Sequence, residues 1–387
     1  MIETRLNTEL TAIASAGLTR RRRVLESPCG RIAAVDGKNL LNFASNDYLG
    51  LAGNPEIAQA MADGAMQWGA GSGASHLVSG HLAPHEALEK EIAAFTSFPR
   101  ALTFSTGYLA NLAVTPTLAG RGDAVFADKL NHASLIDAMQ LAKANGADVQ
   151  RYAHNDMAAL EKMLAASSAA TKIIVSDAVF SMDGDLAPLP LLFALAEQYD
   201  AWLVIDDAHG FGVLGAHGKG SLAHFNLPAA PRILLMGTLG KAAGVGGAFV
   251  AGSQTAIEYL LQKGRSYIFT TATPPAIACA LSKSLQLIAN GDALRANLMA
   301  RIAQLRNGLA DLPWQLLPSA SAIQPLIVGA NEASVALSKA LWERGLWVPA
   351  IRPPTVPKDT ARLRISVSAA HTAADIDQLI SALKEQA

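Results

Sequence analysis

Short apolar runs alternate with amphipathic stretches along most of the chain. The apolar runs predict strands, and the stretches between them, such as residues 189–198, have helical spacing. Most runs are rich in aliphatic and β-branched side chains, which is typical of strands covered on both faces. The predicted strands cover residues 101–104, 124–127, 173–176, 202–205 and 233–236. Repeated strand–helix units predict a mainly parallel sheet, whose ligands bind beyond the carboxyl ends of its strands.

The two ends of the chain follow a different pattern. Residues 32–35 and 40–43 flank Asp36-Gly37 and predict a β-hairpin. From about residue 288 a long amphipathic helix, roughly residues 293–309, leads into a strand, a helix, two strands and a last helix. We therefore expect an N-terminal segment, a large α/β domain and a smaller α+β domain, over residues 1–44, 45–287 and 288–387.

The last of these helices has a recognisable start. Thr372 and Asp375 have the spacing of a capping box, in which each side chain bonds the backbone of the other residue. We therefore expect the C-terminal helix to begin just after Thr372.

Composition adds an expectation about assembly. Apolar residues make up 51% of the 387 residues and charged residues 16%, against a usual charged share of about 25%. So few charges indicate either a small surface or a surface hidden between subunits, and we favour an oligomer. Lys plus Arg number 31 and Asp plus Glu number 32. No global field therefore recruits nucleic acid or an anionic membrane.

Cysteines and the N-terminal residues bear on location. Cys29 and Cys279 lie far apart and form no metal-binding or redox motif, and the chain has no HExxH segment, so no metal is expected. The first ten residues are polar and carry two acids, unlike a secretory signal. No apolar run approaches the roughly 20 residues of a membrane span. We expect a cytoplasmic protein without a membrane partner.

Polar side chains follow the strand predicted at residues 202–205. Asp206 ends that strand, and a buried carboxylate is costly unless it meets a cation or strong donors. It can cap a helix or lie in an ordinary loop. It can also pair with a cationic ring nitrogen, and His209, three residues on, can donate to another atom of the same ligand.

Lys241 stands among glycines and alanines in the segment GTLGKAAGVGG, residues 237–247. Small neighbours leave room for a bulky group beside its amine. Lysine forms Schiff bases, and burial lowers its pKa so that the free amine is accessible. A solvated loop lysine is the alternative. Thr238, in the same segment, can donate to a phosphate.

Two further segments follow predicted strands. Thr106, Gly107 and Tyr108 lie where a strand gives way to a helix. This is the arrangement of an anion site at a helix N-terminus, or else a plain strand-to-helix turn. His132 follows the strand at residues 124–127, and its ring can lie flat on an aromatic cofactor. An ordinary loop histidine is the alternative for this residue.

Five short motifs occur in one order along the chain. They are STGY, NHAS, VFSMDGD, DDAHG and GTLGK, which begin at residues 105, 131, 179, 206 and 237. Together they resemble the α-oxoamine synthases, a family dependent on pyridoxal 5'-phosphate (PLP). The resemblance implies the aspartate aminotransferase-like fold (fold type I), with a mainly parallel large domain and a small α+β domain. It also implies a homodimer with the active site at the subunit interface.

Three other segments resemble one branch of that family, which joins L-alanine to a pimeloyl thioester in biotin synthesis. They are NFASNDYLGL, SAIQPLIVG and IRPPTVP, at residues 42–51, 321–329 and 351–357. The implied acyltransferase reaction releases carbon dioxide and the carrier thiol. Whether the carrier is coenzyme A or acyl carrier protein stays open. The alternatives are a related condensation, such as glycine with acetyl-CoA, and an aminotransferase of the same fold.

The resemblance implies catalytic roles for four residues. Lys241 holds PLP as a Schiff base and, once freed, removes the Cα proton of L-alanine. Asp206 keeps the pyridine nitrogen protonated, and His132 stacks on the ring. His209, with Ser181 as a neighbour, bonds the ring oxygen.

The resemblance also implies which residues bind the phosphate and the substrates. The phosphate contacts are Thr106, Gly107, Tyr108 and Thr238, with Thr270 or Thr271 reaching across from the other subunit. The substrate-binding set is Asn46 and Arg352, which hold the substrate carboxylate, with Thr355 and Arg20. Arg20 meets the thioester or belongs to a solvated run of basic residues. His76 stands where the family often has glycine or arginine, and it either touches the acyl chain or is a surface histidine.

Overall fold

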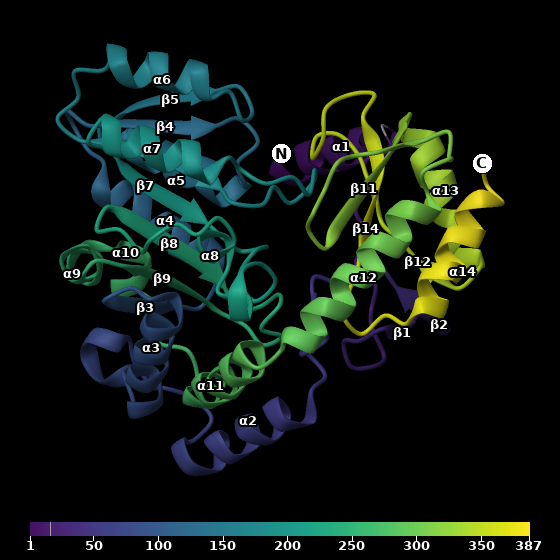
Figure 1. Ribbon diagram of the computed structural model, residues 1–387, viewed down its shortest axis with the longest axis horizontal. Helices are drawn as coiled ribbons and strands as arrows, with labels where there is room; N and C mark the ends of the chain where they lie inside the picture. Colours follow the sequence, from purple (N-terminus) through teal and green to yellow (C-terminus); the bar gives the residue numbers. More distant parts are fainter. Residues whose placement is uncertain (16) are drawn as a thin grey trace.

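The computed structural model describes residues 1–15 and 17–387, which fold into two lobes (Figure 1). The larger lobe is built on a seven-stranded sheet of order β3-β9-β8-β7-β6-β4-β5. Its strands are β3 (Arg100–Phe104), β4 (Ala124–Asp128), β5 (Asp148–Tyr152), β6 (Lys172–Asp177), β7 (Trp202–Asp206), β8 (Ile233–Thr238) and β9 (Ala248–Gly252). Strands β5, β4, β6, β7 and β8 pair in parallel, which is the mainly parallel arrangement expected, although β5 was not among the predicted strands. Strand β9 runs antiparallel to both of its neighbours.

Successive apolar residues of the inner strands lie in two different hydrophobic cores. In β6, for example, Ile174 joins one core, whereas Ile173 and Val175 join the other. Helices cover both faces of the sheet, as the continuous apolar strands predict. The helices of this lobe include α3 (Ala83–Thr96), α4 (Gly107–Leu118), α5 (Ala133–Ala144), α6 (Met157–Ala166), α7 (Leu189–Gln198), α8 (Ser221–His224), α9 (Gln254–Lys263) and α10 (Arg265–Ile268).

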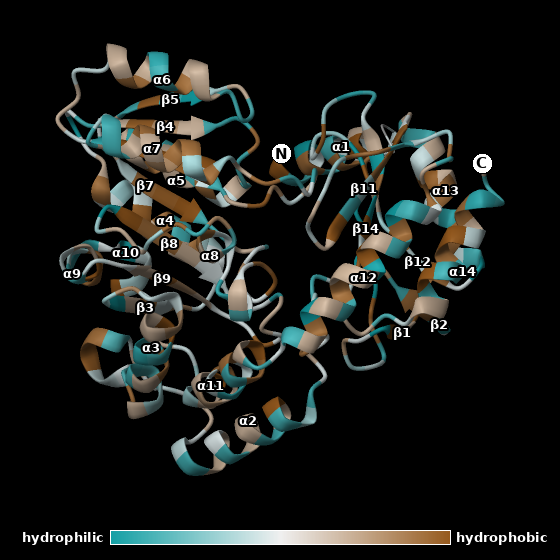
Figure 2. Cartoon of the chain, viewed as in Figure 1, coloured by the Kyte–Doolittle hydropathy of each residue, from teal (hydrophilic) through white to brown (hydrophobic). Residues whose placement is uncertain are grey.

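The smaller lobe contains a four-stranded antiparallel sheet of order β10-β11-β14-β13. These strands are β10 (Gln315–Leu316), β11 (Ile323–Gly329), β14 (Ala361–Ser366) and β13 (Ala350–Ile351). Its helices are α12 (Asp292–Gly308), α13 (Asn331–Glu343) and α14 (Ala373–Lys384). Figure 2 shows hydrophobic colours along β7 of the large lobe and both kinds of colour along α12, which has one solvated face. The predicted capping box opens α14, since Thr372 and Asp375 bond each other's backbone at 2.7 and 3.2 Å.

The predicted N-terminal hairpin is present and belongs with the small lobe. It consists of β1 (Ile32–Val35) and β2 (Lys38–Asn42), and β2 pairs in parallel with β12 (Leu346–Trp347). We therefore propose that the hairpin completes the small domain, while the boundaries expected near residues 44 and 287 stay predictions. The remaining elements are α1 (Ile2–Ser15), α2 (Pro55–Trp68), η1 (His76–Gly80), η2 (Ala216–Gly218) and α11 (Pro275–Ala289). None of the helices described is long and apolar enough to cross a membrane.

Candidate active site

A cavity of about 170 Å³ lies beyond the carboxyl ends of β6, β7 and β8, in the large lobe. This is the edge at which a parallel sheet binds its ligands. The cavity brings together residues that the sequence predicted from separate motifs. Its walls include Gly107, Tyr108, His132, Asp206, His209, Thr238 and Lys241, together with Asn111 and Asp177.

Asp206 closes β7 and faces Asp177, its register partner at the end of β6. Its carboxylate accepts hydrogen bonds from Asn111 Nδ2 at 2.7 Å and from the backbone N–H of Ala208 at 3.0 Å. Burial, reinforced by the negative charge of Asp206, raises the pKa of Asp177 well above its usual range. The neutral acid form is therefore favoured at Asp177, beside a firmly held carboxyl group at Asp206.

His209 links the lysine to the other side of the cavity. Its Nε2 lies 2.7 Å from Lys241 Nζ, and its Nδ1 lies 2.7 Å from Tyr48 Oη. Burial and the nearby Lys241 charge lower the pKa of His209 well below its usual range, so the imidazole is neutral. A neutral imidazole here can accept on one nitrogen and donate on the other.

Lys241 lies in the loop between β8 and β9. Burial of its amine lowers the pKa of Lys241 to about 8, although the carboxyl groups of Asp206 and Asp177 oppose the shift. The loop folds tightly against the chain near Ala52, because a Cβ at Gly244 would lie 2.5 Å from the Ala52 nitrogen. Gly244 also has φ +71°, which a residue with a side chain rarely adopts. Because the pKa of Lys241 is lowered to about 8, a substantial fraction of its side chain is a free amine near neutral pH.

The N-terminus of α4 faces one end of the cavity. The Thr106 side chain caps this helix by accepting from the backbone N–H of Leu109 at 3.2 Å. A Cβ added at Gly107 would lie 3.8 Å from Thr238 Oγ1, so the helix start and the end of β8 are neighbours. Exposed backbone N–H groups at a helix start favour an anion. The Tyr108 hydroxyl, in contrast, donates to Asp137.

His132 is the N-cap of α5 and stands at an exposed part of the cavity. Its Nδ1 lies 2.7 Å from Ser134 Oγ, and its backbone N–H donates to Asp177 at 2.6 Å. The backbone and one ring nitrogen are therefore fixed, and the flat imidazole forms part of the wall.

Arg364, on β14 of the small lobe, reaches toward this cavity and was missed by the sequence analysis. Its guanidinium donates to Asn46 Oδ1 at 3.1 Å and to Tyr48 Oη at 3.4 Å. Its Nε donates to the carbonyl oxygen of Ser181 at 2.7 Å. Arg364 is 5% exposed, so it forms a buried cationic site connected through Tyr48 to His209. The available signal was the alternation of arginines with apolar residues along strand 361–366.

The predicted partners Asn46 and Arg352 do not share a cavity in the described part of the chain. Arg352 lines an outer cavity of about 360 Å³, together with Arg20 and Thr355, near the end of α1. Arg352 Nη1 donates to the carbonyl oxygen of Gly17 at 2.8 Å. The structure therefore separates an inner arginine site from an outer cavity that holds two arginines.

Two other predicted residues, Thr270 and Ser181, are not part of the lining of the inner cavity. The Thr270 hydroxyl donates to the carbonyl oxygen of Ser266 at 2.7 Å and takes no part in this chain's cavity lining. Ser181 contributes its backbone carbonyl to Arg364, as described above. Ser181 begins a segment, residues 181–185, that contacts the small lobe. Within it, Asp183 pairs with Arg362 of β14 at 2.7 Å.

A charged histidine holds the far end of that segment. His154 Nε2 lies 2.8 Å from Asp185, and its Nδ1 lies 3.1 Å from Asp128 at the end of β4. Burial opposes a charge here, but hydrogen bonds to Asp128 and Asp185 outweigh it and raise the pKa of His154 to about 10. The segment that positions Arg364 is thus fixed to the large sheet.

Known proteins resemble the whole chain. The family model described as aminotransferase class I and II matches residues 38–383. An 8-amino-7-oxononanoate synthase of Dechloromonas aromatica (strain RCB) is 87% identical over 387 residues, which is 100% of both chains. One from Herminiimonas arsenicoxydans is 60% identical over 388 aligned residues, which cover 99% of each chain.

The chain belongs to the 8-amino-7-oxononanoate synthases, within the class I and II aminotransferase family.

Two solved structures share the fold of this chain. A serine palmitoyltransferase variant from S. paucimobilis, with a bound PLP–myriocin aldimine, matches with a TM-score of 0.91 at 29% identity. The match covers 98% of this chain and 96% of that one. The crystal structure of 8-amino-7-oxononanoate synthase from Francisella tularensis has a TM-score of 0.78 at 30% identity, over 90% and 97% of the chains. The predicted fold, that of the fold type I PLP-dependent transferases, is confirmed.

Proposed function

We propose that this chain joins L-alanine to a pimeloyl thioester and forms 8-amino-7-oxononanoate, carbon dioxide and the free carrier thiol. This is a step of biotin synthesis, and its product is the compound from which the relatives described above take their name. The observation that carries the proposal is the convergence of Lys241 and Asp206 on one cavity that His132 and His209 also line.

The residues of this cavity fit PLP. Lys241 offers an amine for its aldehyde, and Asp206 offers a carboxylate for its pyridine nitrogen. The start of α4, with Thr106 and Gly107, and the end of β8, with Thr238, provide donors for its phosphate. Tyr108 lines the same wall. When bound, PLP supplies an electron sink for the electrons left at the amino acid's Cα.

Each catalytic residue then has a distinct task. Lys241 would hold the cofactor through its aldehyde, and the free amine of Lys241 would take the proton from the Cα of the amino acid. Asp206 holds a proton on the ring nitrogen through a charge-assisted hydrogen bond. His209, held by Tyr48 and kept neutral, donates to the ring oxygen. His132 provides a flat face on the cavity wall.

Arg364 and Asn46 are proposed to hold the alanine carboxylate. A buried guanidinium that already bonds the Asn46 amide can exchange part of that contact for a planar carboxylate. Arg20, Arg352 and Thr355 are then left for the thioester, whose acyl chain carries a terminal carboxylate. This division revises the expectation that Arg352 shares the alanine carboxylate with Asn46.

The active site is proposed to be completed in a homodimer. Thr270 or Thr271 would contact the phosphate bound by the partner subunit, which accounts for Thr270 lying outside its own chain's cavity lining. Phe269, next to it, is 71% exposed, as expected of a residue near a subunit contact. Sedimentation of the purified protein at twice the chain mass is the expected result, and a monomer that retains full activity would contradict the dimeric site.

Product analysis by mass tests the proposed reaction directly. The purified protein is mixed with PLP, L-alanine and pimeloyl-CoA, and in parallel with pimeloyl-acyl carrier protein. We expect 8-amino-7-oxononanoate with an equal amount of carbon dioxide. Turnover of glycine and acetyl-CoA in preference to this pair would indicate a different condensation. Pyruvate formed without carbon dioxide would indicate an aminotransferase.

A further inference from the structure

Three histidines converge at the start of α3, away from the cavity that contains Lys241. His76 lies in η1, His81 follows η1, and His85 is in the first turn of α3. The ring centroid of His76 lies 5.1 Å from each of the other two. Each residue has a ligand nitrogen within 4.8 Å of the others. None of the three lines the cavity around Lys241.

The outer contacts of two rings decide where their protons are. His81 Nε2 lies 3.2 Å from a carboxylate oxygen of Glu86, which only accepts, so in the neutral ring Nε2 carries the proton. His85 Nε2 lies 2.8 Å from the carbonyl oxygen of Thr273, so it too carries the proton. In both rings the lone pair is therefore on Nδ1.

The inner nitrogens of the three rings lie close to one another. His81 Nδ1 lies 2.8 Å from Nδ1 of His76, and only one proton fits between these two atoms. His85 Nδ1 accepts the backbone N–H of Leu82 at 3.0 Å. In metal sites a ligating histidine commonly donates its other N–H to a carboxylate or a carbonyl, as His81 and His85 do here.

We propose that His76, His81 and His85 bind a late first-row divalent cation such as Zn²⁺ through Nδ1. Imidazole suits these cations, and tetrahedral Zn²⁺ with bonds of about 2.0–2.1 Å separates its nitrogen ligands by about 3.3 Å. The His76 and His81 nitrogens need to part by about half an ångström to reach that separation. His85 must release the Leu82 N–H, so it is the weakest of the three ligands.

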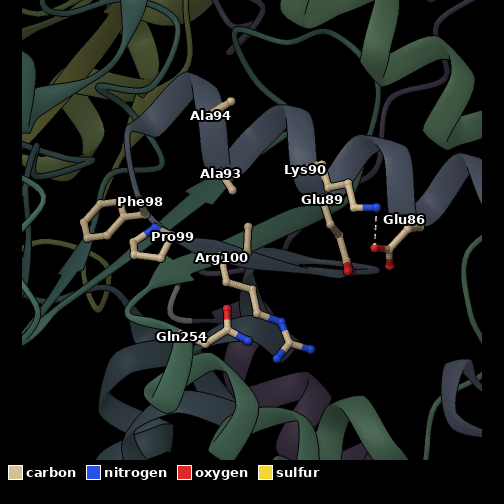
Figure 3. Close-up of a pocket in the computed structure, with 10 residues that line it drawn as sticks. Glu86, Glu89, Lys90, Ala93, Ala94, Phe98, Pro99, Arg100 and Gln254 are labelled. Atoms are coloured by element: carbon tan, nitrogen blue, oxygen red, sulfur yellow. Dashed lines mark ion pairs between the residues drawn. The ribbon is translucent and has the colours of Figure 1, made fainter.

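Two glutamates beside the histidines are less suitable as ligands. Glu86 and Glu89 line a cavity of about 630 Å³ between α3 and β3, where Figure 3 shows them with Lys90 and Arg100. Glu89 is buried and accepts from the Thr103 backbone N–H at 2.8 Å and its hydroxyl at 2.9 Å. Glu86 pairs with Lys90 at 2.9 Å. Both carboxylates already have hydrogen-bond or ion-pair partners, so we do not include them among the metal ligands. Glu86 instead orients the His81 ring through its contact with Nε2.

Zinc uptake by the holoenzyme tests the site. After chelator treatment and dialysis against Zn²⁺, we expect one equivalent per chain in the wild type and its loss in the His76→Gln and His81→Gln variants. His224→Gln is the matched control, since His224 is exposed and packs on Phe225 well outside the cluster. Metal that binds PLP or Lys241 would be the same in all variants, so equal uptake by wild type and both cluster variants overturns the proposal.

The orienting glutamate provides a second, graded test. Glu86→Gln should weaken Zn²⁺ affinity by about 10- to 100-fold, as expected when a carboxylate behind a ligating histidine is lost. Lys90→Gln, which removes the other partner of Glu86, should change it by less than about threefold. Equal losses in the two variants would contradict an orienting role.

A spectrum keeps the proposal testable if the variants fail to fold. Co²⁺ bound to the wild-type holoenzyme should give the intense visible bands of a tetrahedral nitrogen-ligated ion. If Co²⁺ shows only the weak absorption of an aqueous octahedral ion, the site does not exist.

Discussion

The two halves of the candidate site are built in different ways. The half proposed for PLP takes Asp206, His209 and Lys241 from the ends of neighbouring strands in one sheet. The half proposed for the substrates takes Asn46 from near the N-terminal hairpin and Arg364 from β14, residues 318 positions apart in the sequence. The first half follows from local motifs on a buried sheet. The second half exists only because the small lobe brings both ends of the chain against the large lobe.

A hydrogen-bonded chain joins the halves. Arg364 donates to Tyr48, Tyr48 meets His209, and His209 meets Lys241. A substrate carboxylate at Arg364 is thus connected to the position of the catalytic amine. If one half binds PLP and the other binds the substrates, substitutions in the PLP half should reduce kcat. Substitutions in the substrate half should chiefly raise KM.

The largest effect is expected at Lys241. Lys241→Ala removes both the covalent link to PLP and the base for the Cα proton, so kcat should fall by about 10⁴-fold or more. Borohydride reduction followed by peptide mapping should find the cofactor on Lys241 in the wild type. A label on another lysine would contradict the assignment of the whole PLP half.

The adjacent carboxyl groups of β6 and β7 should respond very differently to the same change. Asp206→Asn should retain PLP but lose about 100-fold in kcat, because a neutral amide cannot hold a charged ring nitrogen. Asp177→Asn should lose less than about fivefold, since the raised pKa of Asp177 already favours its neutral form. Equal losses in steady-state kcat would show that the two carboxyl groups share the charge.

The two arginine sites should separate by substrate. Arg364→Lys should raise KM for L-alanine by about 30-fold, because a lysine cannot make the bidentate contact of a buried guanidinium. Arg352→Lys should leave that constant unchanged and raise KM for the thioester by about fivefold, as expected of a more exposed charge. Steady-state kinetics with each substrate varied in turn distinguishes these outcomes. If Arg352→Lys raised KM for L-alanine more than Arg364→Lys does, the result would support the original prediction that Arg352 holds the alanine carboxylate.

Cofactor capture by the apoenzyme should depend on pH through Lys241. With a pKa of about 8, the reactive free amine increases about tenfold per pH unit below that value and levels off above it. Stopped-flow absorbance after mixing apoenzyme with PLP should give a rate that follows this curve. A rate that keeps rising to about pH 10, as for an ordinary exposed lysine, would contradict burial of the amine.

The smallest effect is expected at His154, which fixes the segment between the two halves. Its raised pKa of about 10 means that its charge stabilises the fold fully below about pH 6.5, and that this contribution is lost as pH rises through about 10. His154→Gln should therefore lower the free energy of unfolding by about 1 kcal/mol near pH 6 and by less near pH 10.

Urea unfolding at the two pH values provides this measurement. His224→Gln, an exposed histidine outside the segment, is the control and should leave stability unchanged at both. A His154→Gln penalty that grows toward pH 10 would mean that the imidazolium does not support the segment.

Local signals carried the prediction of the fold further than that of the substrate site. Continuous apolar strands and the helices after them gave the parallel part of the large sheet, and Thr372 with Asp375 gave the start of α14. Strand β9 was not among the predicted strands, and its antiparallel direction has no signal in the sequence, because an apolar strand has the same pattern in either direction. Arg364 was missed because the alternation of arginines with apolar residues along 361–366 gives no sign of which partners they meet.

The sequence by itself determined which groups surround the proposed cofactor, since Asp206 and Lys241 each follow an apolar run that predicts a buried strand. The carboxyl ends of parallel strands meet at one edge of the sheet. Tertiary structure alone decided that Arg364, rather than Arg352, meets Asn46, and that Tyr48 joins that pair to His209. The physical reason is distance along the chain. Motifs record short-range geometry, whereas a site between lobes depends on how the surfaces of the two lobes meet.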